Sequence, residues 1–421
     1  LFHILISTSA VLIFLKKAPF SLLFKTLFIF GYFILYEYNI ISRNYMLGVL
    51  FLFLACSIFK DRGKNFILLC FLLAVAANTH LMFSVISIAI FLTLIFEIIQ
   101  DKALYNTKTI IYGVLLFLFG IIISIIQIIP ETTSFFDRIN DLSLQEKLIP
   151  GGFSFFKGLF PIPDFRSIQF WNSNLFVNIS KPISAITGII VYFIPLFLFY
   201  KRKYTLFFVY IALLGTQVFF FITQISATRY FGMTFIILII AMWLNYYYST
   251  IENTFSKQYK NLRNTIIYGI LIIQCVAGVI AFTMDIIYPF SSGKEVALFL
   301  KEKELLHHTI VTQSCEGTVI SSDIRKKLFF LCGENLESFC RWGITPNCKL
   351  LKKDIIQKLS KISSNESIIF ISKEKLSGSL DKNIWHEVGK NLNVKLLTKI
   401  DTTIVRRTDY YIYEVKNKFN D

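Results

Sequence analysis

The sequence predicts an α-helical polytopic membrane protein of about ten spans, followed by a small extracytoplasmic α/β domain. Hydrophobic residues make up 55% of the 421 residues and charged residues only 17%, which is more apolar surface than a soluble domain needs. Long apolar runs follow one another as far as about residue 284, after which charged residues return. Basic residues recur in every second connection between these runs, as in a polytopic membrane protein.

Most of the apolar runs are close to the ~20 residues with which a helix crosses the hydrocarbon core. Residues 65–99 are too long for one span, so we divide them at Asn78-Thr79-His80 and expect a tight hairpin there. The predicted spans of the membrane domain, residues 1–284, lie at about 1–15, 20–36, 44–59, 65–79, 81–99, 109–129, 183–200, 204–223, 230–248 and 265–284.

The net charge of +16 raises the question of a nucleic-acid partner. The basic residues instead mark alternate connections, which the positive-inside rule places in the cytoplasm. We therefore expect no nucleic-acid binding and a multi-pass membrane protein, with the loop at 130–182 and residues 285–421 outside. The basic connections contain Lys16 and Lys17, Lys60, Arg62 and Lys64, Lys102 and Lys108, Lys201, Arg202 and Lys203, and Lys257, Lys260 and Arg263.

The loop at 130–182 mixes charged residues with many aromatic ones. Gly151-Gly152 and Pro161-Ile162-Pro163 argue against a regular helix through its centre. Two interpretations stay open: an amphipathic cover on the membrane surface, and a loop that contacts substrate.

The predicted outer domain alternates strands with helices, which suggests a small α/β sandwich. Ser292-Gly-Lys-Glu295 has the pattern of a capping box that opens a helix. No nucleotide-binding glycine motif occurs in this domain. Strands are expected at 308–313, 328–331, 367–372, 394–400 and 410–415, and helices at 350–362 and near 385–392.

The cysteines agree with this topology. Three lie in predicted spans, where free thiols act as small hydrophobic groups, and four lie in the outer domain. Two disulfides, with three possible connectivities, or free buried thiols are both compatible with the sequence. A zinc site is less favoured because no C-x-x-C pair occurs. The outer four are Cys315, Cys332, Cys340 and Cys348.

The turn after the second span contains a first group of candidate binding residues. Arg43 would pair bidentately with a phosphate, Tyr38 and Tyr45 would stack on a sugar ring, and Glu37 would hold Arg43. The alternative is that Arg43 and Tyr45 only anchor the turn at the membrane interface.

Two further candidates lie at outer ends of spans. His80 would donate to a lipid phosphate or a sugar hydroxyl, or else be a solvated residue of the hairpin. Arg229-Tyr230 opens the ninth span, where a second guanidinium facing the first would clamp a phosphate; snorkelling of Arg229 to the interface is the alternative.

Over residues 1–290 the chain resembles the GT-C superfamily of polytopic glycosyltransferases, in particular the bacterial proteins related to protein O-mannosyltransferases and aminoarabinose transferases. The resemblance rests on the order of spans, the single long outer loop after the sixth span, and four motifs. These are Arg43-Asn-Tyr45, Asn78-Thr-His80, Ala227-Thr-Arg229-Tyr230, and Trp243-Leu244, which follows Tyr230 in the same span.

The resemblance implies an enzyme that transfers a sugar from a polyprenyl-phosphate donor to an acceptor lipid, glycan or protein on the outer face of a bacterial plasma membrane. It implies Arg43, Tyr45, His80, Arg229 and Tyr230 as substrate-binding residues. Its catalytic carboxylate belongs to an outer loop that we expect before Leu1, so the catalytic residue is unknown and the 1–421 chain alone is expected to be inactive.

No cofactor is predicted, and a divalent metal stays open. Two other classes of protein remain as alternatives. A lipid or solute transporter needs polar residues at the bilayer midplane, where the spans hold few. An O-antigen polymerase or ligase would share the lipid-linked substrate but fits the outer domain less well.

Overall fold

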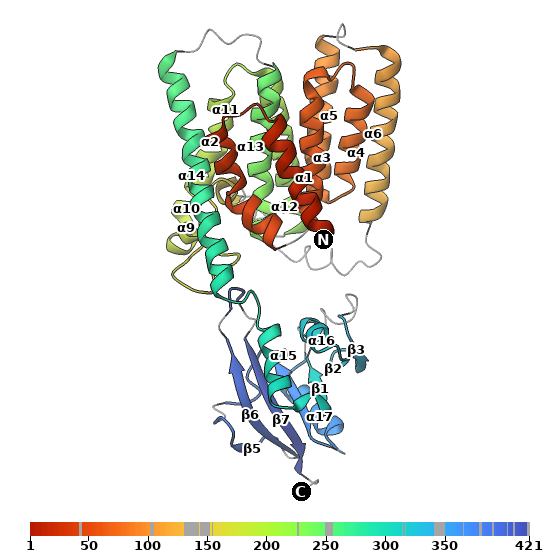
Figure 1. Ribbon diagram of the computed structural model, residues 1–421, viewed down its shortest axis with the longest axis vertical. Coiled ribbons are helices and arrows are strands. Elements are labelled where there is room, and N and C mark those ends of the chain that lie inside the picture. Colours follow the sequence, from red (N-terminus) through yellow and green to blue (C-terminus); the bar gives the residue numbers. More distant parts are fainter. Residues whose placement is uncertain are drawn as a thin grey trace. The chain divides into compact units, whose positions relative to one another are not determined.

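The chain forms two compact units, one of residues 1–164 and 172–283, and one of residues 165–171 and 284–421. In this computed structural model the first unit is helical and the second is built on a β-sheet (Figure 1). The structure describes residues 1–418 apart from 42–43, 102–104, 130–142, 144–151, 154, 225–226, 249–255, 314, 316, 341–349, 365, 379–380, 390, 402 and 407–408.

The helical unit consists of helices and short connections. Its named α-helices are α1 Phe2–Lys17, α2 Leu22–Ile29, α3 Tyr45–Ile58, α4 Phe66–Ala77, α5 Leu81–Gln100, α6 Thr107–Ile128, α9 Leu175–Ile179, α10 Lys181–Tyr192, α11 Ile194–Leu198, α12 Lys203–Thr223, α13 Thr228–Tyr248 and α14 Lys257–Ile287. A π-helix, Tyr32–Ile40, lies between α2 and α3.

Six stretches in the described part of the chain are long and apolar enough to cross a membrane: α5, α6, α10 with α11, α12, α13 and α14. The expectation of about ten spans is not confirmed, because α1 to α4 have only 16, 8, 14 and 12 residues. At about 1.5 Å per residue, helices of these lengths fall short of the ~30 Å hydrocarbon core. The hairpin at Asn78-Thr79-His80 is present, since α4 ends at Ala77 and α5 begins at Leu81.

The apolar run at 20–36 does not form one helix because the chain breaks at Gly31. Gly278 of α14 lies against this break: a Cβ added there would meet the carbonyl oxygen of Phe30 at 2.4 Å and the amide nitrogen of Tyr32 at 2.8 Å. Gln274, one turn earlier on α14, donates to the carbonyl oxygen of Gly158 at 2.8 Å. Helix α14 therefore packs closely against both the break and the helical residues 155–159.

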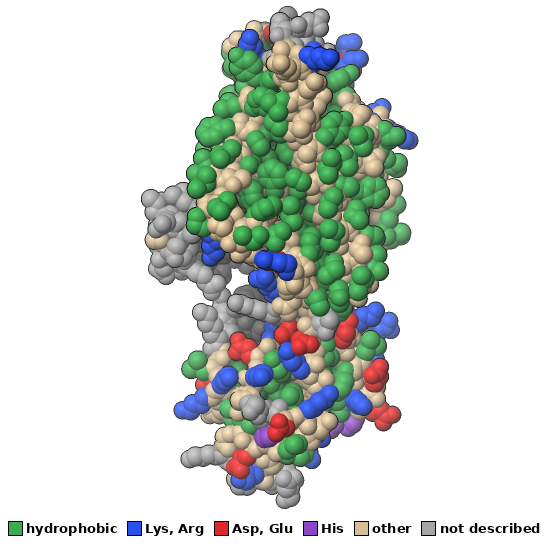
Figure 2. Space-filling view, turned by 90° about the vertical axis from the view of Figure 1, so that its left-hand side faces the viewer, with side chains coloured by type: hydrophobic (Ala, Val, Ile, Leu, Met, Phe, Trp, Pro, Cys, Tyr) green, Lys and Arg blue, Asp and Glu red, His purple; other side chains and the backbone are tan. Residues whose placement is uncertain are grey.

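The connections of the helical unit gather at two ends. One end, which we call the basic end, carries the turns between α1 and α2, α3 and α4, and α11 and α12, together with the end of α5, the start of α6, the end of α13 and the start of α14 (Figure 1). The described basic residues predicted for alternate connections lie in these turns or in the adjoining ends of the helices. The opposite end carries the π-helix, the α4–α5 hairpin and the turn before α13 (Figure 1). Hydrophobic side chains cover the visible face of the helical unit (Figure 2).

A buried ion pair ties together the turns of the basic end. The Arg62 guanidinium bonds both carboxylate oxygens of Glu97, one of them from Nε at 2.8 Å. The same carboxylate accepts hydrogen bonds from the hydroxyls of Tyr105, at 2.8 Å, and Tyr248, at 3.2 Å. This arrangement supplies the hydrogen bonds that a carboxylate needs when it is removed from water.

The second unit contains a mixed seven-stranded sheet in the order β3-β2-β1-β4-β7-β6-β5. Strand β1 runs parallel to β2 and β4, and the other pairs are antiparallel. The elements are α15 Gly293–Glu302, β1 Thr309–Thr312, α16 Gly317–Ile324, β2 Leu328–Phe330, β3 Asn335–Glu337, α17 Lys352–Ile362, β4 Ile368–Ser372, β5 Trp385–Glu387, β6 Leu392–Ile400 and β7 Tyr410–Asn417.

Two apolar clusters, one with α15 and α16 and one with α17, pack on the sheet. Segment 165–171 belongs to this unit: the Trp171 ring lies 5.3 Å from that of Phe290, and its amide donates to the Ile404 carbonyl at 3.4 Å.

The five expected strands and the helix at 350–362 are present, but two details were wrong. Residues 385–387 are a strand rather than the start of a helix, because β5 pairs with β6 and Gly389, with φ of 71°, reverses the chain. Ser292 does precede α15 but makes no side-chain capping bond, so the capping box is not formed.

The described cysteines of the second unit are oxidised. Cys315 is bonded to Cys340. Cys332 is disulfide-bonded as well, whereas Cys348 lies outside the described residues. Cys56, Cys70 and Cys275 are free.

Candidate functional site

Four of the five predicted binding residues meet at the end of the helical unit opposite the basic end. The His80 ring centroid lies 5.1 Å from that of Tyr45 and 5.6 Å from that of Tyr230. The rings of Tyr45 and Tyr230 are 6.1 Å apart and perpendicular, and the guanidinium carbon of Arg229 lies 4.9 Å from the Tyr230 centroid. We call Tyr45, His80, Arg229 and Tyr230 the aromatic-arginine cluster.

The cluster joins the starts of three helices, α3, α5 and α13. Asn44, the residue before α3, donates from Nδ2 to the carbonyl oxygen of Thr79 at 2.9 Å, which fixes the start of α3 to the start of α5. Asn172 accepts from the amide of Thr228 at 3.1 Å and so caps α13. These side-chain bonds satisfy backbone groups that a helix end leaves open.

The π-helix contributes Tyr38 to the same place. Its ring stacks on that of Tyr45 at 5.1 Å, and its hydroxyl donates to the carbonyl oxygen of Arg229 at 2.9 Å. Tyr38 therefore sets the position of the backbone that carries Arg229. π-Helical turns are uncommon and are frequently found at functional sites.

His80 is oriented and neutral. Its Nδ1 accepts a hydrogen bond from the amide of Met82 at 3.1 Å, so the proton of the neutral ring belongs on Nε2. Burial and the nearby Arg229 guanidinium lower the pKa of His80, which precedes the α5 span, to about 4. A neutral His80 with a proton on Nε2 is a hydrogen-bond donor that adds no charge.

Arg229 supplies the positive charge of the site. Its side chain interacts with both Tyr45 and Tyr230, and its Nε is buried without a hydrogen-bond partner among the described residues. A buried guanidinium N–H gains most from an anionic acceptor, and its planar donor pattern matches phosphate. The cluster can therefore bind an anion next to flat aromatic faces.

Arg43, the fifth predicted residue, lies outside the described residues, so its expected pairing with Arg229 and Glu37 stays a prediction. Glu37 itself is buried in the π-helix, where its carboxylate accepts a hydrogen bond from the hydroxyl of Tyr32 at 2.9 Å.

Sequence reasoning missed Lys157. This residue belongs to the helical residues 155–159, and its ammonium lies 5.0 Å from the ring centroid of Phe231, the neighbour of Tyr230. Burial lowers the pKa of Lys157 to about 8. In the sequence, Lys157 is marked only as a single cation in an aromatic-rich stretch of the long loop. In the structure it adds a second positive charge near the aromatic-arginine cluster.

In the part of the chain that the structure describes, no three or more His, Cys, Asp or Glu side chains are grouped as metal ligands. A comparison of the chain with known protein families, with curated proteins and with solved structures found no match.

Proposed function

We propose that the chain is a membrane glycosyltransferase that binds a polyprenyl-phosphate-linked sugar at the aromatic-arginine cluster. The observation that supports this most directly is the Arg229 guanidinium, which lies among tyrosine rings beside a neutral histidine. An arginine that only anchored a helix at the membrane interface would not need to be enclosed by these rings. A phosphate that leaves a sugar gains negative charge, and a fixed cation at a poorly solvated site stabilises that charge.

The remaining side chains of the cluster suit the sugar. Tyr45 and Tyr230 offer flat apolar faces with hydroxyls at their edges, and His80 offers a neutral N–H donor. We further propose that Arg43, two residues before Tyr45 in the sequence, adds a second guanidinium to the phosphate. The acceptor is left open.

The proposal includes a membrane topology. The six candidate spans, together with the shorter apolar helices and the residues that flank them, form the ten membrane segments, with the basic end in the cytoplasm of a bacterium. The aromatic-arginine cluster and residues 285–421 then face the outside. An impermeant thiol reagent should label a cysteine placed at the exposed Lys375 in intact cells; labelling only after permeabilisation would overturn this topology.

Equilibrium binding to the purified chain in lipid nanodiscs tests the function. A short-chain polyprenyl-phosphate sugar should bind saturably and be displaced by polyprenyl phosphate, whereas the free sugar should not compete. Displacement by the free sugar alone would favour a solute transporter. A wild-type chain that binds neither lipid would refute the proposed donor class.

A further inference from the structure

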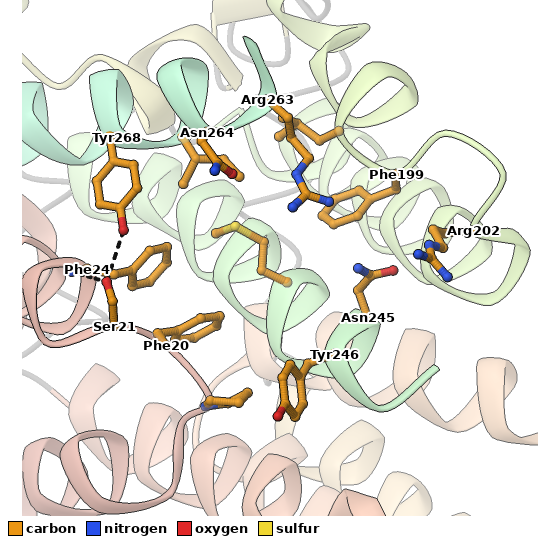
Figure 3. A pocket seen from close by; sticks show the side chains of 14 residues that line it. Phe20, Ser21, Phe24, Phe199, Arg202, Asn245, Tyr246, Arg263, Asn264 and Tyr268 are labelled. Atoms are coloured by element: carbon orange, nitrogen blue, oxygen red, sulfur yellow. Dashed lines mark hydrogen bonds between the residues drawn. The ribbon is translucent and has the colours of Figure 1, made fainter. Parts of the chain in front are cut away.

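A cavity of about 260 Å³ lies at the basic end of the helical unit, away from the aromatic-arginine cluster. It is formed by the turn between α1 and α2, the end of α11, the end of α13 and the start of α14 (Figure 3). The lining residues that decide what it can bind are Phe20, Ser21, Phe24, Arg202, Asn245 and Arg263.

The polar groups of this cavity favour an anion. Arg263 points its guanidinium toward the cavity, and its Nε is buried with no hydrogen-bond partner in the described part of the chain (Figure 3). The Asn245 carbonyl oxygen accepts a hydrogen bond from Thr205 at 3.3 Å, which leaves its amide nitrogen turned inward (Figure 3). Arg202 adds a second guanidinium, and no carboxylate is among the lining residues. The cavity therefore presents positive charge and N–H donors to a guest.

Hydrogen bonds between the surrounding helices hold this arrangement in place. Tyr259, one turn before Arg263 on α14, donates to the carbonyl oxygen of Phe197 at 2.6 Å and so ties α14 to the end of α11. Tyr268, on the same helix, bonds Ser21 at 2.9 Å, and Ser21 also caps α2. The helices and turns that form the cavity are thus already hydrogen-bonded to one another without a bound anion.

The surroundings indicate that the anion carries an apolar tail. The Phe20 and Phe24 rings stack at 4.2 Å in one wall of the cavity. Leu22, next to Ser21, and Leu262, next to Arg263, are exposed large apolar side chains. A free phosphate would make no apolar contacts with these surfaces, whereas the acyl chains of a lipid can pack along them.

We propose that this cavity binds the phosphate headgroup of an anionic membrane lipid, with Arg263, Arg202 and Asn245 on the phosphate and the acyl chains along α2 and α14. Because the site lies at the basic end, it is separate from the proposed donor site, and either proposal can fail without the other.

The test is lipid binding to the purified chain by native mass spectrometry, with phosphatidylglycerol and phosphatidylcholine titrated separately. The wild type should prefer phosphatidylglycerol. Arg263→Gln should weaken phosphatidylglycerol binding about tenfold, the lower range for one charge-assisted contact to phosphate, and Arg263→Lys should retain most of it. Lys260→Gln removes an exposed charge from the same helix outside the cavity lining and should change nothing.

Two results would overturn the proposal. Equal loss of phosphatidylglycerol binding in Arg263→Gln and Lys260→Gln would show only a general attraction to the basic end. Competition by glycerol 3-phosphate or inorganic phosphate at the same concentration as the lipid would show a site for a soluble anion. Elution of the variants as folded monodisperse protein in size-exclusion chromatography separates either result from misfolding.

Discussion

The hydroxyl of Tyr38 donates a hydrogen bond to the carbonyl oxygen of Arg229 at 2.9 Å, although 191 residues separate them. This bond fixes the backbone of the cluster's cation to the π-helix, while the Tyr38 ring stacks on Tyr45. Tyr38 is thus a positioning residue for both the charged and the aromatic part of the candidate site.

Removal of this hydroxyl should weaken donor binding while the ring stays in place. Tyr38→Phe should lower the affinity for a polyprenyl-phosphate sugar about fivefold, the equivalent of ~1 kcal/mol for one hydrogen bond. Tyr268→Phe, which removes a hydroxyl at the basic end, should leave donor affinity unchanged. Equal donor affinity in Tyr38→Phe and the wild type would show that this bond does not position the site.

The close approach of α14 to the break in the second apolar run makes a stability prediction. Gly278→Ala should lower stability by about 1–3 kcal/mol, because the new Cβ would meet backbone atoms of Phe30 and Tyr32. Gly269→Ala is the control on the same helix, where a Cβ meets nothing within 4 Å, and should be neutral or stabilising by up to about 1 kcal/mol. Thermal unfolding in detergent compares the two; a Gly278→Ala variant as stable as Gly269→Ala would contradict the observed packing.

The ion pair at the basic end gives a second stability prediction. Glu97→Gln should destabilise the protein by about 3 kcal/mol, because the mostly buried Arg62 loses its counter-charge. The double variant Arg62→Met, Glu97→Leu should recover a large part of this loss, since an apolar pair has no uncompensated charge. If thermal unfolding shows the double variant to be less stable than Glu97→Gln, the ion pair has a role beyond the mutual neutralisation of its charges.

Sequence reasoning could place four cluster residues together because polar groups at the ends of apolar runs fall on one side of the membrane once the basic connections are assigned. It also found the hairpin before His80 and five of the strands. The same alternation explains why the described residues of the predicted basic connections share one end of the helical unit.

Other features depend on contacts that the sequence does not display. The break at Gly31 arises where α14 presses against the chain, and no periodicity marks that crossing. In the sequence, Glu97 is only a polar residue at the end of an apolar run. Its pairing with Arg62 is visible only in the folded structure. The start of the expected helix near 385–392, Trp385–Glu387, is a strand because pairing with β6 outweighs its local preference.

His80 should stay neutral where an ordinary histidine titrates. The pKa of His80 is lowered to about 4, so its NMR signals should show no titration between about pH 5 and 8 in the free protein. Because the unfolded chain binds the proton at about pH 6.5 and the folded chain only near pH 4, His80 should reduce stability as the pH falls through this interval. Burial and the Arg229 charge are the two causes of the lowered pKa of His80, so Arg229→Ala removes one of them and should raise this pKa. A titration near pH 6.5 in the wild type would show that His80 is solvated.

The most direct test of the account is the donor affinity of Arg229→Ala in lipid nanodiscs. The loss of one charge-assisted contact should weaken binding of a polyprenyl-phosphate sugar about ten- to hundredfold, and Arg229→Lys should lie between this variant and the wild type. Lys181→Ala removes an exposed cation at the start of α10 and serves as the control, with unchanged affinity expected. Unchanged donor affinity in Arg229→Ala, with normal insertion and folding, would mean that Arg229 only anchors α13 at the membrane interface and would contradict the proposed site.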